Sequence, residues 1–112
     1  MTVIAKALLG AKYAENSQTT QFTSPTGVRT LVDKFTATNV TASAATLSVN
    51  VVTSGGAASA ANLILDGKSL AAHETYTLPE LVGQILNAGD FVSTIAGTAS
   101  AIVIRASGRE VS

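Results

Sequence analysis

His73 is the only histidine of the chain and directly precedes Glu74, so acid–base or metal chemistry would have to start at this pair. A strand directs neighbouring side chains to opposite faces, and the two groups would therefore not converge on one ion. The chain also has no Gly-x-Ser-x-Gly nucleophile elbow to accompany a Ser-His-Asp triad. We interpret His73 as an exposed histidine at the start of a strand.

The carboxylates stand apart from one another along the chain. Asp66 and Asp90 each adjoin a glycine, where a short acidic side chain accepts hydrogen bonds from turn amides. No Asp-x-Asp spacing indicates a calcium loop, and the absence of cysteine excludes disulfides and zinc–thiolate sites. The sequence therefore predicts a protein that is not an enzyme, with no catalytic residue, cofactor or metal.

The composition excludes further classes of function. Seven Lys and Arg balance seven Asp and Glu, and a neutral chain lacks the cationic surplus that nucleic-acid binding requires. No apolar run approaches the roughly 20 residues of a membrane span. Lys6 and Lys12 interrupt the apolar residues that could form a secretion signal. We expect a soluble protein made in the cytosol, with neither nucleic acid nor membrane as a partner.

Short strands separated by turn residues account for most of the chain. The clearest is Ala45–Thr53, where Leu47, Val49 and Val51 alternate with polar residues, as in a strand with one buried face. The same reasoning predicts further strands at residues 19–23, 28–40, 62–65, 75–78, 91–96 and 101–107. If the first segment of the chain is counted as a further strand, about eight strands at this spacing indicate an all-β sandwich or barrel in one domain, residues 1–112.

Three more predictions concern the segments between the strands, and a fourth concerns the N-terminal segment. Thr41–Ala44 is expected to form a hairpin between the strands that flank it, and Asp66-Gly67 a two-residue type I′ turn. Glu80–Leu86 is the only internal stretch that favours a helical turn, because its apolar residues share a helical face. Residues 1–22 are ambiguous: Val3–Tyr13 fits a helical stripe or a strand, and the segment could form an N-terminal arm.

Three segments resemble small virion proteins of tailed bacteriophages: Val32–Asn39, Gly89–Ala96 and Ile102–Gly108. The shared features are a strand ending in Thr-Asn, a late Gly-Asp turn and a final strand ending in Ser-Gly, and they extend from about residue 28 onward. The resemblance implies a compact β-sandwich, jelly-roll-like, that decorates or cements a phage head. It brings no catalytic residues.

The function expected from the sequence is therefore structural. We expect a capsid decoration or cement protein that is made in the host cytoplasm, resides in the virion, binds the major capsid protein and forms a homo-oligomer, as a dimer or trimer. A tail or head–tail connector component is the alternative; a carbohydrate-binding module is disfavoured because tryptophan is absent. The arm alternates apolar residues with lysines and is expected to contact partners. The expected contact residues are Val3, Ile4, Leu8, Leu9, Tyr13 and Phe22.

Overall fold

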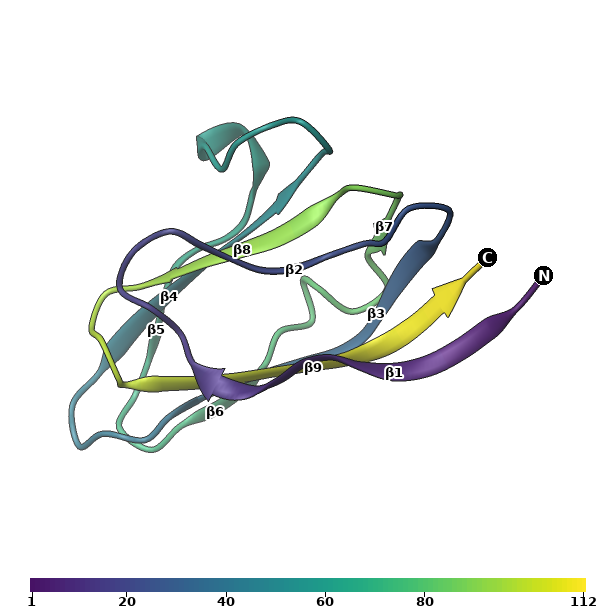
Figure 1. Ribbon diagram of the computed structural model, residues 1–112. Helices are drawn as coiled ribbons and strands as arrows, with labels where there is room; N and C mark the ends of the chain where they lie inside the picture. The colour runs from purple at the N-terminus through teal and green to yellow at the C-terminus, as the bar shows by residue number, and fades with distance from the viewer.

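The computed structural model describes residues 1–112 as two antiparallel sheets packed face to face (Figure 1). Sheet A has the strand order β1-β9-β3-β6, with β7 also paired to β3, and sheet B has the order β2-β8-β4-β5. The predicted β-sandwich is confirmed. The strands are β1 (Val3–Tyr13), β2 (Thr19–Thr23), β3 (Arg29–Asn39), β4 (Ala45–Val52), β5 (Leu63–Leu70), β6 (Thr75–Thr77), β7 (Ile85–Leu86), β8 (Phe91–Ala96) and β9 (Ile102–Val111).

The strands pair in a nested order, from the two ends of the chain toward its middle. β1 pairs with β9, β2 with β8, β3 with β6 and β7, and β4 with β5. This nested pairing, divided between two sheets, is the topology of a jelly roll. Residues 1–22, the possible N-terminal arm, therefore form β1 and most of β2, which are one edge strand of sheet A and one of sheet B.

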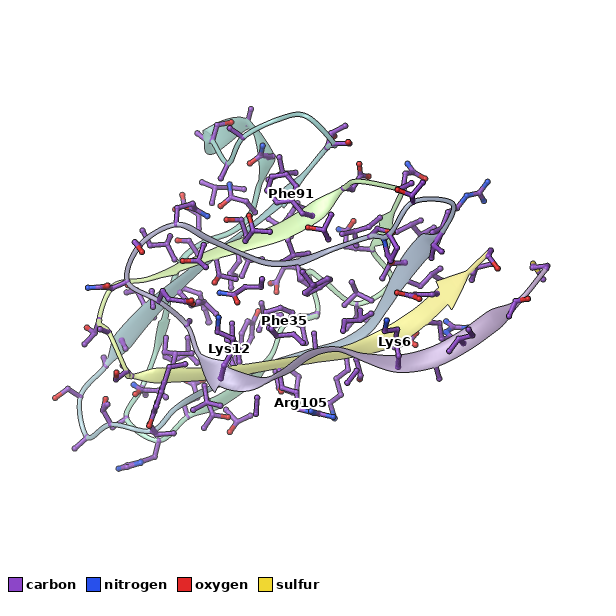
Figure 2. All side chains as sticks on the ribbon, viewed as in Figure 1. Lys6, Lys12, Phe35, Phe91 and Arg105 are labelled. Atoms are coloured by element: carbon purple, nitrogen blue, oxygen red, sulfur yellow. The ribbon has the colours of Figure 1, made fainter.

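The core lies between the sheets and follows the predicted alternation. Leu47 and Val49 of β4 are fully buried, as are Phe35 of β3 and Ile102 and Ile104 of β9. Each side chain of this size contributes about 2 kcal/mol when it is removed from water. In Figure 2, Phe35 lies between the two sheets, whereas Arg105 projects away from sheet A on its outer side.

The predicted hairpin at Thr41–Ala44 is wrong, because β3 belongs to sheet A and β4 to sheet B. The connection crosses from one sheet to the other around Asn39, which is fully buried. Its amide nitrogen donates to the carbonyl oxygens of Ser43, Leu70 and Ala71, and its oxygen accepts from the Thr41 amide and hydroxyl. Period-two alternation does not specify which strand lies alongside which, so the sequence did not distinguish a hairpin from a crossing.

The predicted turn at Asp66-Gly67 is a β-bulge inside β5. The register passes from Leu47 opposite Lys68 to Val49 opposite Leu65, so both residues lie opposite Ser48. Gly67 has the positive φ, 58°, that the turn would also have required. Its amide donates to the Ser48 hydroxyl at 2.8 Å. A glycine with positive φ was therefore identified correctly, but its place in the sheet was not.

The predicted helical turn at Glu80–Leu86 is also wrong. Gly83 there has a φ of 85°, and the chain continues into β7, which pairs with β3. The only helical element is the 3₁₀ turn Ala60–Asn62, and no helix has the length and apolar character needed to span a membrane. Ser59 caps this turn by accepting a hydrogen bond from the Ala61 amide.

Candidate protein-contact surface

The outer faces of the two sheets differ in what covers them. On sheet B, Asn50, Val52 and Ser93 alternate with core residues and so face outward, yet each is at most 2% exposed. The loop between β4 and β5 covers Asn50, which donates hydrogen bonds to Ser59 and Asn62 in that loop. The Ser93 hydroxyl accepts a hydrogen bond from Gln18, which precedes β2. Figure 1 shows this loop with the 3₁₀ turn standing above sheet B, whereas no segment covers the outer face of sheet A.

Four basic residues lie on the open outer face of sheet A. On β3, Phe35 and Ala37 are buried, so Thr36 faces outward, and Arg105 lies opposite it on β9. Lys34 lies opposite Ser107, one step along the same face. We call the outward-facing set Arg29, Lys34, Arg105 and Arg109 the cationic face.

Three cations of this face have no partner within the protein. Elsewhere, Lys6 pairs with Glu110 at 3.1 Å and Lys12 with Glu15 at 2.9 Å. Lys68 lies 5.0 Å from the centroid of the Tyr76 ring, within the range of a cation–π contact. On the cationic face only Arg109 is paired, with Asp33. The basic residues left without an ion pair or aromatic partner are Arg29, Lys34 and Arg105.

This placement makes a neutral protein strongly asymmetric in charge. Four cations and the carboxylate of Asp33 give the face a formal charge of +3, and the rest of the neutral chain therefore carries −3. A depression of about 210 Å³ lies on the face, and Lys34, Thr36, Arg105 and Ser107 line it. The ammonium group of Lys34 and the guanidinium group of Arg105 can donate hydrogen bonds to carboxylate oxygens, and the two hydroxyls beside them are further donors.

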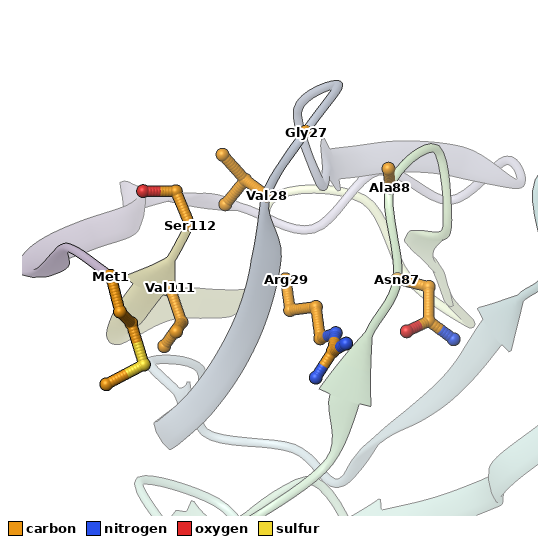
Figure 3. A pocket seen from close by; sticks show the side chains of 8 residues that line it. All are labelled: Met1, Gly27, Val28, Arg29, Asn87, Ala88, Val111 and Ser112. Atoms are coloured by element: carbon orange, nitrogen blue, oxygen red, sulfur yellow. The ribbon is translucent and has the colours of Figure 1, made fainter.

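A second hollow lies where the two chain ends meet. Its volume is about 500 Å³, and Figure 3 shows Met1 and Val111 on one side of it and Arg29 and Asn87 on the other. Met1 is 99% exposed here. The hollow adjoins the Arg29 end of the cationic face and adds an apolar border to it.

The residues expected to contact partners fall into two groups. Val3, Ile4 and Tyr13 on β1 are exposed, at 50%, 53% and 49% respectively. Leu9 belongs to the core, whereas Leu8 and Phe22 are partly buried and pack against it. The structure thus does not place the six expected contact residues on one surface. Val3 lies opposite Val111 and Tyr13 opposite Val103, so both face outward, close to the cationic face.

The residues with potential for chemistry remain separate in space. His73 is exposed in the turn before β6, as expected for its position, and no group of three or more His, Cys, Asp or Glu side chains could hold a metal ion. Asp90 accepts hydrogen bonds from the amides of Ser54 and Asn87, which confirms its predicted role in a turn. Asp66 lies in the bulge of β5.

Sequence reasoning missed the cationic face because its members come from two strands far apart in the chain. A signal was present in the last strand, where Arg105 and Arg109 are an even number of residues apart and so share a face. Only the register of β3 against β9 adds Arg29 and Lys34. No family model, curated protein or solved structure matches the chain.

Proposed function

We propose that the protein is a structural subunit of a tailed-bacteriophage virion, which binds the major capsid protein and stabilises the head. In this proposal the cationic face is the docking surface, and the capsid subunit contributes carboxylates to it. The protein is made in the host cytoplasm and resides on the assembled capsid.

The gathering of Arg29, Lys34 and Arg105 on one uncovered face is the observation that carries the proposal. Surface cations without a partner are hydrated and free to interact with another protein. A complementary acidic surface is attracted to them, and the two proteins associate faster. The jelly-roll topology is also common among viral capsid proteins. Because one fold serves many functions, that likeness supports the proposal less than the charges do.

A capsid offers many identical sites, so a modest contact is sufficient. Repetition across a lattice increases the total stabilisation without any single contact being strong. Salt bridges at an exposed face are screened by salt, and binding should therefore weaken as ionic strength rises. This behaviour distinguishes docking through the cationic face from docking through the apolar residues near Met1, which salt would not weaken.

The test uses heads of the encoding phage that were assembled without this protein. Purified protein is added, the heads are sedimented, and the complexes are imaged by electron cryomicroscopy. Density repeated over the icosahedral shell, with β3 and β9 against the capsid subunit, is the expected result. Density at a single vertex would instead support the tail or connector alternative, and failure to co-sediment would overturn the proposal.

A further inference from the structure

The first half of β1 is an open strand edge. All five residues of Val3–Ala7 are exposed, and their one strand neighbour is β9. A free edge has a row of unpaired backbone donors and acceptors, and another chain can pair with it. Val3 and Ile4 add exposed apolar side chains to this edge strand, since each of them is at least half exposed.

The other sheet edges have features that discourage pairing. On sheet A, β6 and β7 have only three and two residues. On sheet B, β2 has five residues interrupted by a register shift, and β5 contains the bulge at Asp66-Gly67. Short strands and bulges are common means of blocking edge-to-edge association. In β1 the register shifts are confined to the second half, after Ala7.

The hydrogen-bonding direction of the free edge follows from the chain ends. Thr2 and Ser112 exchange both backbone hydrogen bonds, at 3.1 and 2.9 Å. In an antiparallel pair such residues alternate with residues whose amide and carbonyl point the other way. The register is unbroken from Val3 opposite Val111 to Ala7 opposite Ser107. Val3, Ala5 and Ala7 therefore direct their backbone groups to the free edge.

We infer that a second copy of this chain occupies this edge, with the two β1 strands antiparallel and Ala5 opposite Ala5 of the other copy. In this register Val3 lies opposite Ala7, and all three edge-facing residues of each strand are used. About six backbone hydrogen bonds would join the copies. Sliding the strands until Ala5 lies opposite Ala7 would place Lys6 opposite Lys6, and like charges directly opposite each other are destabilising.

A second copy is the occupant that the residues favour. The residues whose backbone groups point to the free edge are a valine and two alanines, and their small side chains on the face of the sheet leave room for a second strand beside them. Lys6, the one charge in this stretch, is paired with Glu110, and in this register it lies opposite Ile4 of the other copy rather than opposite another charge. The two-fold axis of such a dimer is perpendicular to the joined sheet. Both cationic faces then lie on the same side, which would double the docking surface proposed above.

The inference is tested by the mass of the protein in solution. Sedimentation equilibrium should show a concentration-dependent increase from 11.3 kDa to twice that value. Ala5→Pro removes an amide that points away from β9, so the fold should survive while the dimer weakens by about tenfold or more. Ala5→Val keeps the amide and should dimerise like the wild type. A wild type that stays monomeric up to about 1 mM would overturn the inference.

A cross-linking experiment tests the register independently of the proline variant. The natural chain has no cysteine, so Ala5→Cys introduces the only thiol. Two such thiols at the centre of an antiparallel pair lie within the range that permits a disulfide. Ala5→Cys should give a covalent dimer under mild oxidation, and Thr46→Cys, an exposed residue of sheet B, should not. Equal cross-linking of the two variants would contradict the inference, whether or not the protein binds capsids.

Discussion

Arg109 and Asp33 form a bidentate ion pair across the outer face of sheet A, with Nε donating to Oδ2 at 3.0 Å and Nη2 to Oδ1 at 2.9 Å. The hydrogen bonds from Arg109 to Asp33 raise the pKa of the guanidinium above its ordinary value. Asp33 is the extra residue of a bulge in β3, which places its carboxylate on this face. It is the one acid within the cationic face, and it neutralises one of the four cations.

Removing that acid should strengthen capsid binding. Asp33→Asn would release Arg109 and raise the formal charge of the face from +3 to +4. We expect tighter binding to heads at low salt, with little change in melting temperature, because exposed ion pairs contribute little to stability. Asp66→Asn is the matched control, since it removes an exposed acid from sheet B and leaves the cationic face unchanged. Equal effects of the two variants in a sedimentation assay would contradict the prediction.

Gly108 allows β9 to approach β3 closely. A β-carbon built there would collide with the carbonyl oxygen of Leu31 and would lie 2.8 Å from Cδ1 of Leu8. Gly108→Ala should therefore lower the free energy of unfolding by about 3 kcal/mol in urea denaturation. Gly10→Ala on β1 is the control, because no atom lies within 4 Å of the point that its β-carbon would occupy. A Gly108→Ala protein as stable as the control would contradict the packing of β9 against β3.

Asn39 holds the crossing between the two sheets together. Asn39→Ala would leave the buried carbonyl of Leu70 without this donor and would remove the acceptor of the Thr41 amide. Unsatisfied buried groups each cost about 1–3 kcal/mol, so a loss of about 3 kcal/mol is expected. Chemical denaturation measures this loss. Thr38→Ala, in which an exposed hydroxyl contact with Thr75 is lost, should cost far less.

Glu15 should make stability depend on acidic pH. Hydrogen bonds from Gln21 and Lys12 hold the pKa of its carboxyl below the ordinary value of 4.5. Because the folded-state pKa is the lower one, this stabilisation is complete above the unfolded-state pKa and is lost as pH falls through the folded-state pKa. Glu15→Gln should therefore be less stable than the wild type at neutral pH. The difference should shrink at about pH 3, and a difference that does not change with pH would contradict this assignment.

The sequence predicted where the strands lie more accurately than how they pair. β2 and β8 occupy the predicted residues, and β4 differs by one residue at its end. Alternation of apolar and polar residues identifies the inward-facing side chains, because a strand with one buried face needs an apolar residue at every second position. It carries no information about the neighbouring strand, and so it could not separate the crossing at Asn39 from a hairpin. Likewise, the positive φ of Gly67 suits both a turn and a bulge.

The candidate surface was less accessible to sequence reasoning than the fold. The net charge of the chain is zero, which suggests no charged surface, and Lys34 and Arg105 are far apart in the sequence. Their proximity depends on a β3–β9 register that includes a bulge between Val32 and Lys34. A one-residue change of register would turn one of the two cations toward the core. Tertiary pairing therefore creates the surface.

The central claim is that the cationic face, rather than overall charge, binds the phage head. Two double variants test it, because both change the net charge from 0 to −4: Lys34→Glu/Arg105→Glu on the face, and Lys12→Glu/Lys68→Glu elsewhere. The measurement is the fraction of each folded variant that co-sediments with heads at low salt. We predict at least about tenfold weaker binding for the face variant and near-wild-type binding for the other. Equal binding by the two variants would contradict the claim.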